Sequence, residues 1–195
     1  MFLENPEHAH SQQGWVEVIC GSMFSGKTEE LIRRLKRARI AGLKVDVFKP
    51  TVDQRYSENQ VVTHDTVAID ATVVDAASSI LLLSGGLNVI GIDEAQFFDS
   101  SLVDVANSLA NMGIRVIIAG LDTDYRGKPF GSMPALMAIA EYVTKVHAIC
   151  MKCGNLANFS HRKTIDKQLV LTGETDLYQP LCRSCYFQIQ DENKK

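Results

Sequence analysis

The sequence lacks any uninterrupted apolar run near the ~20 residues that a helix needs to cross a bilayer, so we do not expect a membrane protein. Its first residues have neither the basic start nor the apolar centre of a secretory signal. We therefore expect a flexible N-terminal segment over residues 1–14 and a cytoplasmic location. Internal repeats and low-complexity stretches are also missing, so no repeat architecture is expected.

An excess of basic residues is missing as well. The chain of 195 residues has a formal net charge of −3, which argues against broad nucleic-acid binding. One local basic cluster remains, either as the solvated face of a helix or as a contact to phosphate or to another subunit; it consists of Arg33, Arg34, Lys36, Arg37 and Arg39. Length and composition suit a single substantial core with a small appendage.

The most informative motif is Gly21-Ser22-Met23-Phe24-Ser25-Gly26-Lys27-Thr28, which satisfies G-x-x-x-x-G-K-[ST] and follows the apolar run 15–20. Glycines let the backbone wrap around an anion, so that successive N–H groups and the N-terminus of the next helix face phosphates. In such loops the lysine, here Lys27, reaches the β- and γ-phosphates, and the hydroxyl of Thr28 binds Mg²⁺. The motif therefore predicts a site for a phosphate-bearing ligand.

Buried strands and helices alternate along the rest of the chain. Strands are expected at 15–20, 44–48, 67–74, 87–94, 114–121 and 143–149, and helices from the phosphate loop to Gly42 and at 76–83, 101–112 and 134–141. A polar loop is expected at 51–62. This order predicts an α/β fold of the P-loop NTPase type, a parallel sheet with helices on both faces. Ligands then bind beyond the carboxyl ends of the strands.

Two adjacent acids, Asp93 and Glu94, end the apolar strand that begins at Leu87. Asp93 has the position of a Walker B aspartate, which holds Mg²⁺ beside the hydroxyl of Thr28. Glu94 is placed to accept a proton from the oxygen that attacks the γ-phosphorus. If that oxygen belongs to water the chain is an ATPase, and if it belongs to a substrate hydroxyl the chain is a kinase.

Four of the five cysteines form two C-x-x-C pairs, Cys150/Cys153 and Cys182/Cys185. Together they offer the four thiolates that a structural Zn²⁺ prefers, and a reducing cytoplasm favours metal over disulfides. The segment 154–181 between them is longer than the ~15–20 residues of a compact zinc ribbon. We expect residues 15–149 to form the P-loop domain, 150–187 a zinc domain with a lasso-like loop over the ligand, and 188–195 a flexible tail.

These motifs together resemble the type II thymidine kinases over roughly residues 15–187. The resemblance rests on six segments in order: 21–28, Asp53-Gln54-Arg55-Tyr56, Thr63-His64-Asp65, 91–98 (Gly-Ile-Asp-Glu-Ala-Gln-Phe-Phe), 127–131 (Gly-Lys-Pro-Phe-Gly) and 178–186. It implies ATP-dependent phosphorylation of the 5′-hydroxyl of thymidine, with Glu94 as the general base. It also implies a homotetramer, and inhibition by the end product thymidine triphosphate.

Site residues follow from the same resemblance. The nucleotide site comprises residues 21–28 with Asp93, Glu94, Ala95 and Gln96. The residues implied to line the nucleoside pocket are Met23, Phe97, Leu121, Tyr125 and Phe130, closed by Leu169, Leu171, Thr172 and Tyr178. An apolar, aromatic pocket suits a flat pyrimidine with a methyl group. The roles of Asp53, Arg55, Arg126 and Arg162 stay open.

The chain departs from the family pattern at two places. Cys185 stands where some members have a histidine ligand, and Glu174-Thr175 stand where small residues are common. The main competing hypothesis is a nucleic-acid-stimulated ATPase, because the segment 93–96 also resembles the acidic signature of helicases. A third is a zinc-containing regulatory module that binds ATP without turnover.

Overall fold

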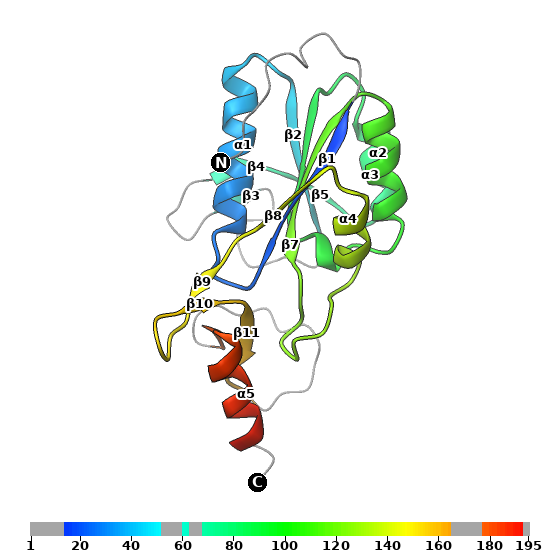
Figure 1. Cartoon of the computed structure of the whole chain (residues 1–195). Coiled ribbons are helices and arrows are strands. Elements are labelled where there is room, and N and C mark those ends of the chain that lie inside the picture. Colours follow the sequence, from blue (N-terminus) through cyan, green and yellow to red (C-terminus); the bar gives the residue numbers. More distant parts are fainter. Residues whose placement is uncertain (1–13, 52–59, 63–67, 165–176, 193–195) are drawn as a thin grey trace.

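A six-stranded parallel sheet forms the centre of the computed structural model, which describes residues 14–51, 60–62, 68–164 and 177–192 (Figure 1). The strand order is β5-β2-β6-β7-β1-β8. All neighbours run parallel. The strands are β1 Trp15–Gly21, β2 Val45–Pro50, β5 Thr72–Val74, β6 Val89–Ile92, β7 Arg115–Leu121 and β8 Tyr142–Lys145. The predicted α/β architecture is confirmed.

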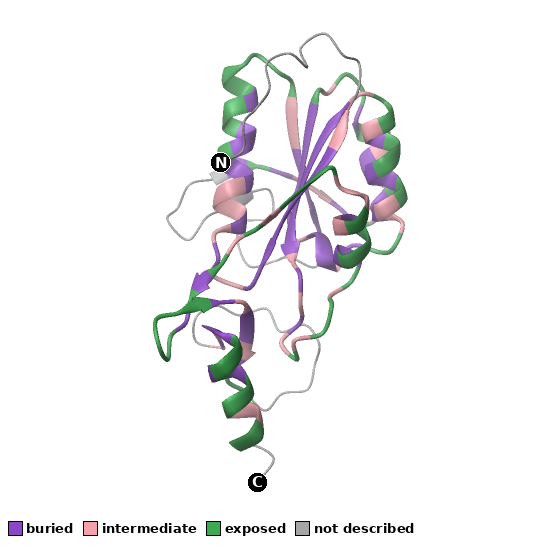
Figure 2. Cartoon of the chain, viewed as in Figure 1, coloured by how far each residue is buried: buried purple, intermediate pink, exposed green. Residues whose placement is uncertain are grey.

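Helices cover both faces of this sheet. Helix α1, Lys27–Ile40, packs on one face, and three helices pack on the other: α2 Ser78–Leu83, α3 Leu102–Asn111 and α4 Met133–Ile139 (Figure 1). Acidic residues in the first turn of α1 and basic residues in its last turn complement the helix dipole. The central strands are buried along most of their length, as Figure 2 shows. Continuous apolar strands are what a sheet covered on both faces requires.

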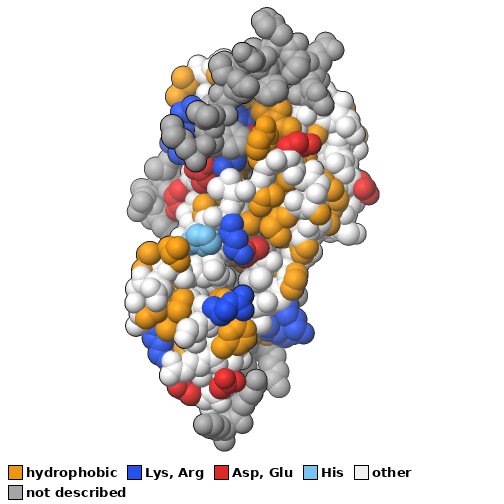
Figure 3. Space-filling model, in the orientation of Figure 1, with side chains coloured by type: hydrophobic (Ala, Val, Ile, Leu, Met, Phe, Trp, Pro, Cys, Tyr) orange, Lys and Arg blue, Asp and Glu red, His pale blue; other side chains and the backbone are white. Residues whose placement is uncertain are grey.

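Strand β8 is one edge of the sheet and keeps apolar side chains in contact with solvent. Tyr142 and Val143 are 42% and 48% exposed. Hydrophobic side chains gather over the region of β8 and α4 in Figure 3. No helix in the described ranges is long and apolar enough to cross a membrane.

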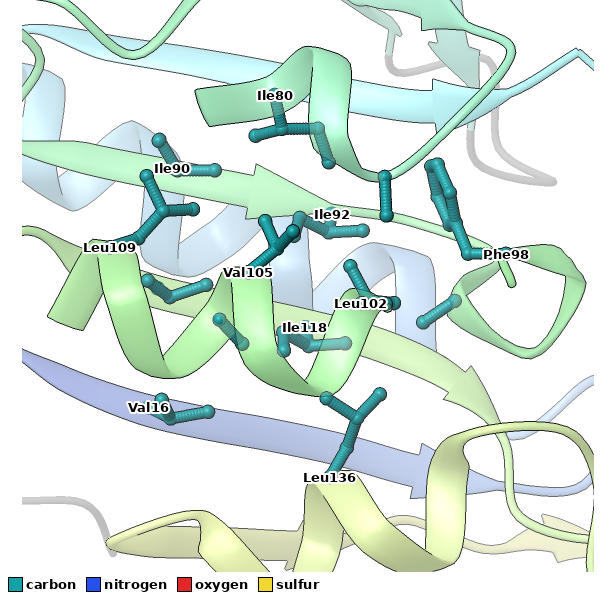
Figure 4. Packing of buried hydrophobic residues seen from close by; sticks show 14 of the residues in the cluster. Val16, Ile80, Ile90, Ile92, Phe98, Leu102, Val105, Leu109, Ile118 and Leu136 are labelled. Atoms are coloured by element: carbon teal, nitrogen blue, oxygen red, sulfur yellow. The ribbon is translucent and has the colours of Figure 1, made fainter. Parts of the chain in front are cut away.

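The larger core lies between the sheet and helices α2, α3 and α4. Ile90, Ile92 and Ile118 of the central strands meet Leu102, Val105 and Leu109 of α3 there, and each is at most 4% exposed (Figure 4). The apolar residues of α3 recur at the three- to four-residue spacing that places them on one helix face. The parallel pairing of β6 with β7 places the acids that follow β6 near the end of β7.

A buried ion network ties α1 to the sheet. The Glu17 carboxylate in β1 is fully buried and accepts hydrogen bonds from Arg34 Nη1 at 2.7 Å and from Arg115 Nε at 2.6 Å. Arg34 also donates to Glu30 and to Thr144 in β8. The other residues of the basic cluster on α1 are exposed to solvent, as expected. Arg34 instead points inward, because Glu17 provides a buried partner.

Two of the expected strands are each divided into two shorter strands. Residues 67–74 do not form one strand: β4, Ala68–Asp70, pairs antiparallel with β3, Gln60–Val62, whereas β5 joins the main sheet. Residues 143–149 divide in the same way, because β8 pairs with β1 and β9, Ala148–Ile149, pairs antiparallel with β10, Leu156–Ala157. In each run one part joins a strand of the main sheet that is distant in sequence, and the other part pairs antiparallel with a nearby segment.

The C-terminal region has a small core of its own, below the carboxyl ends of the sheet strands in Figure 1. It contains β9, β10, the antiparallel pair β11, Phe159–Arg162, and β12, Tyr178–Leu181, and helix α5, Arg183–Glu192. Because α5 reaches Glu192, residues 188–192 of the expected flexible tail are helical. Residues 1–13 and 193–195 lie outside the described part of the chain.

Candidate active site

The loop after β1 is shaped by its two glycines. Gly21 has φ 155°, and a Cβ there would lie 2.3 Å from the carbonyl oxygen of Val146. Gly26 has φ 83° and caps α1, which begins at Lys27. The Lys27 ammonium is 9% exposed and donates to the carbonyl oxygen of Ser22 at 2.8 Å. A helix N-terminus with an adjacent ammonium is the arrangement that binds phosphate.

The hydroxyl of Thr28 lies beside the first acid. Thr28 Oγ1 donates to Asp93 Oδ2 at 3.2 Å, although the two residues are 65 positions apart. Asp93 is 6% exposed, and its N–H donates to the carbonyl oxygen of Phe48 at 2.9 Å, which fixes the chain after β6 to β2. The two oxygen donors assigned to Mg²⁺ thus lie together at the base of the phosphate loop, with the chemistry that Mg²⁺ prefers.

Glu94 has a backbone conformation that is uncommon outside glycine, with φ 51° and ψ 40°. Such strain persists where the surroundings hold it, often at functional sites. The N–H of Glu94 donates to Asp93 Oδ1 at 2.9 Å, and Gln96 Nε2 donates to Glu94 Oε2. The turn thus bonds the Glu94 backbone to the first carboxylate and the Glu94 side chain to Gln96.

Gln96 connects the second carboxylate to the end of β7. Its side chain is 3% exposed, and its Oε1 accepts the backbone N–H of Leu121 at 2.8 Å. A backbone N–H can only donate, so it settles which end of the amide is oxygen. The NH₂ end must therefore face Glu94, and it gives one carboxylate oxygen a fixed donor.

Aromatic side chains lie in the segments that follow β6 and β7 and in β12. Phe97 and Phe130 meet edge to face, with ring centroids 5.7 Å apart. The Arg162 guanidinium carbon lies 3.8 Å from the centroid of the Tyr125 ring, and Arg162 Nη2 donates to the hydroxyl of Tyr178 at 2.6 Å. Arg162 is 6% exposed, so both interactions are largely shielded from water.

The four cysteines of the two C-x-x-C pairs converge. Their sulfurs all lie within 4.8 Å of one another, and Sγ of Cys153 and Sγ of Cys182 are 3.6 Å apart. Sulfurs of a tetrahedral zinc centre with bonds of about 2.3 Å are roughly 3.8 Å apart. The donor set and its spacing therefore fit Zn²⁺.

The thiols of this cluster differ in acidity. Burial raises the pKa of the Cys150 thiol, but backbone N–H groups of Cys182, Lys152 and Cys153 outweigh it and lower the pKa to about 6. Hydrogen bonding with Cys182, together with burial, raises the pKa of Cys185 to about 12. Thiolate ligands are required for zinc, so binding must displace the protons that remain on the cluster.

The family model of thymidine kinase matches residues 14–186. The chain belongs to the thymidine kinase family. A thymidine kinase of Bacteroides fragilis (strain YCH46) is 58% identical over 195 residues, which are 100% of this chain and 98% of that protein. A thymidine kinase of Porphyromonas gingivalis (strain W83) is 60% identical over 185 residues, 94% of this chain and 90% of that protein. One of Rhodothermus sp. is 61% identical over 173 residues, 89% and 81% of the two chains.

Within this thymidine kinase family fold, many of the described residues expected at the site lie at the same end of the sheet. The phosphate loop, the segment 93–96 and the aromatic residues Phe97, Tyr125 and Phe130 lie at the carboxyl ends of β1, β6 and β7 or in the segments that follow them. Met23, Leu121 and Tyr125 are half-buried and Tyr178 is 7% exposed. The other expected residues, Leu169, Leu171 and Thr172 of the covering loop and Asp53 and Arg55, lie outside the described residues.

Three contacts of the site were not anticipated. Arg162 contacts Tyr125 and Tyr178, which are both expected in the nucleoside pocket, and Gln96 donates to Glu94. Ser160 accepts a hydrogen bond from the phosphate loop. The position of Gln96 two residues after Glu94 was a usable signal, because a tight turn brings such side chains together. Nothing in the local sequence distinguishes Ser160 or Arg162 from ordinary strand residues.

Proposed function

We propose that this protein transfers the γ-phosphoryl group of ATP to the 5′-hydroxyl of thymidine and so forms thymidine monophosphate for nucleotide salvage. The observation that carries the proposal is the contact of Thr28 with Asp93 beside Glu94, at the base of a phosphate loop, in a chain of the thymidine kinase family. The aromatic side chains of the cleft supply an acceptor site that an ATPase would not need.

The residues have distinct roles in the proposed reaction. Residues 21–28 hold the phosphates of ATP through backbone N–H groups and Lys27, and Asp93 to Gln96 complete the nucleotide site. Thr28 and Asp93 would hold Mg²⁺, which neutralises charge on the phosphate oxygens when it is bound. The thymidine 5′-oxygen forms a bond to the γ-phosphorus, the bond from that phosphorus to the bridging oxygen breaks, and the 5′ proton passes to Glu94.

The acceptor pocket is proposed to consist of the half-buried side chains Met23, Phe97, Leu121, Tyr125 and Phe130, with Leu169, Leu171, Thr172 and Tyr178 closing it. Aromatic faces provide stacking surfaces for a planar base. The rings of Phe97 and Phe130 hold each other in place by their edge-to-face contact. We propose that this wall selects a pyrimidine, with the thymine methyl group against apolar carbon.

The decisive experiment is a nucleoside panel with ATP and Mg²⁺, in which thymidine, deoxyuridine and deoxycytidine are compared as acceptors by product chromatography. We expect thymidine monophosphate from the wild-type chain. Glu94→Gln should lower kcat by about 10²- to 10⁴-fold, the usual contribution of a general base, while ATP still binds. Absence of product from folded, zinc-loaded protein would refute the function. ATP hydrolysis that increases with DNA and ignores thymidine would favour the ATPase instead.

We also propose that Cys150, Cys153, Cys182 and Cys185 hold one structural Zn²⁺, which stabilises the fold when bound and takes no part in the phosphoryl transfer. The convergence of the four sulfurs within 4.8 Å of one another supports this assignment. Metal analysis of purified protein should give one zinc per chain.

Assembly into a homotetramer and inhibition by thymidine triphosphate are further proposals. The exposed apolar residues of the edge strand β8 are compatible with subunit contacts. Light scattering after gel filtration measures the mass of the assembly. A titration of the thymidine reaction with thymidine triphosphate, repeated at several ATP concentrations, tests the inhibition and its competition with ATP. We expect the protein to act in the cytoplasm.

A further inference from the structure

The phosphate loop is bonded to the C-terminal cysteine-bearing region as well as to its own domain. The N–H of Met23 donates to Ser160 Oγ in β11 at 2.9 Å, across 137 positions of sequence. Ser160 is 3% exposed and Met23 is half-buried, so the accepting side of this bond is shielded from water. Beside it, Ser22 Oγ lies 3.4 Å from the carbonyl oxygen of Ala157 in β10. Residues Ser22 and Met23 of the loop are therefore bonded to the strands next to the cysteine cluster.

The carbonyl side of the Ser22–Met23 peptide accepts hydrogen bonds from within the loop. The carbonyl oxygen of Ser22 accepts the hydroxyl of Ser25 at 2.7 Å and the ammonium of Lys27 at 2.8 Å. The Ser22 carbonyl and the Met23 N–H belong to one planar trans peptide unit, so they point in opposite directions. Any group that fixes the N–H therefore also fixes the carbonyl to which Lys27 is bonded.

The next residue, Phe24, is also held by the C-terminal region. Phe24 has φ 62°, a conformation that strains a residue with a side chain. Its half-buried side chain packs against the small core of the C-terminal region, which contains Phe159 and Tyr186. The packing compensates the strain, so the loop's shape at Phe24 also depends on this core.

We propose that Ser160 is a positioning residue for the phosphate loop: by holding the Ser22–Met23 peptide, it sets the loop geometry in which nucleotide phosphates bind. Without its hydroxyl, the Met23 N–H loses a buried partner and the peptide turns to find another. Nucleotide binding must then restore the orientation. The cysteine-bearing region thus contributes to ATP binding through the phosphate loop, in addition to any part it has in covering the nucleoside. This inference rests on the proposed use of the loop for ATP.

The test is the dissociation constant of Mg²⁺·ADP, measured by calorimetry on the full, zinc-loaded chain. A net hydrogen bond of about 0.5–1.5 kcal/mol corresponds to a loss of affinity of about 3- to 10-fold in Ser160→Ala. Ser160→Thr retains the hydroxyl and should restore most of the affinity. Ser108→Ala is the matched control, because it removes an exposed serine hydroxyl that bonds a backbone carbonyl within α3.

Zinc content and melting temperature accompany each titration, because a residue with only a structural role would lower the melting temperature and leave ADP affinity in the folded protein unchanged. Unchanged affinity in folded Ser160→Ala overturns the inference, whereas a wild-type chain that binds no ADP overturns the proposed function. If Ser160→Ala does not fold, hydrogen exchange of the native protein decides: slow exchange of the Met23 amide supports the contact, and exchange at the rate of an open loop refutes it.

Discussion

Replacing Glu17 by glutamine should destabilise the protein far more than replacing the neighbouring acid Glu30. Both Glu17 oxygens are used as acceptors: Oε2 by Arg34, and Oε1 by Arg115 and by Trp15 Nε1 at 2.7 Å. An amide NH₂ at either position cannot accept, and it would face a donor. The carboxylate and Arg34 are also almost completely inaccessible to water.

The magnitude follows from this burial. Removing one partner of a buried ion pair costs about 3–5 kcal/mol, because the remaining charge is left uncompensated. For a chain of this size each kcal/mol lowers the melting temperature by about 2–4 °C, so we expect a decrease of about 6–20 °C for Glu17→Gln.

The control is Glu30→Gln on the same helix as Arg34. Glu30 pairs with Arg33, whose side chain is 54% exposed, and it also bonds the buried Arg34. Hydrogen bonding to Arg33, opposed by burial and assisted by Arg34, lowers the pKa of Glu30 to about 2. When Glu30 is replaced, Arg34 keeps its bond to the Glu17 carboxylate, so no buried charge is left uncompensated, and we expect a smaller loss of stability than for Glu17→Gln. Urea unfolding followed by circular dichroism measures both variants, and equal losses of stability would refute the reasoning.

Two further changes test the site. Gln96→Met should remove the donor to Glu94 while keeping the side-chain volume. Since a hydrogen bond to a charged group contributes about 1.5–3 kcal/mol, kcat should decrease about 10- to 100-fold, with a smaller change in the KM for thymidine. In a Glu94→Gln background the same substitution should lower kcat little further. A fully additive decrease in kcat would show that Gln96 does not act through Glu94. Cys182→Ser should reduce the zinc content below one per chain and expose the C-terminal region to protease, whereas Cys20→Ser, in a buried strand away from the cluster, should retain zinc even if it loses stability.

Much of the fold and the site could be predicted because the signals are local. The phosphate loop, the acids after β6 and the paired cysteines each depend on residues a few positions apart, and their chemistry constrains that spacing. Long apolar strands such as β7 can be predicted for the same reason, because a buried parallel strand has no polar positions to interrupt it. The segment 67–74 has an equally apolar sequence, but its division between β4 and β5 depends on two different partner strands.

Most of the contacts that hold the site could not be predicted, because they join residues far apart in sequence. Arg34 belongs to a basic run that suits a solvated helix face, and only the buried carboxylate of Glu17 on β1 explains its burial. Ser160 is an unremarkable strand residue until β11 is placed against the phosphate loop. The burial of Arg162 is likewise explained only by its contacts with Tyr125 and Tyr178, which lie 37 and 16 positions away in the sequence.

The C-terminal region holds the loop that follows β7 in the same way as it holds the phosphate loop. The hydroxyl of Tyr186 donates to the carbonyl oxygen of Tyr125 at 2.7 Å, and Arg162 covers the Tyr125 ring. One small region thus bonds to both loops that face the proposed substrates. A core of this size stabilises little by burial alone, so a metal centre is the expected source of its rigidity. Loss of zinc should therefore loosen both loops together, and nucleotide and nucleoside affinities should decline in parallel as the metal is removed.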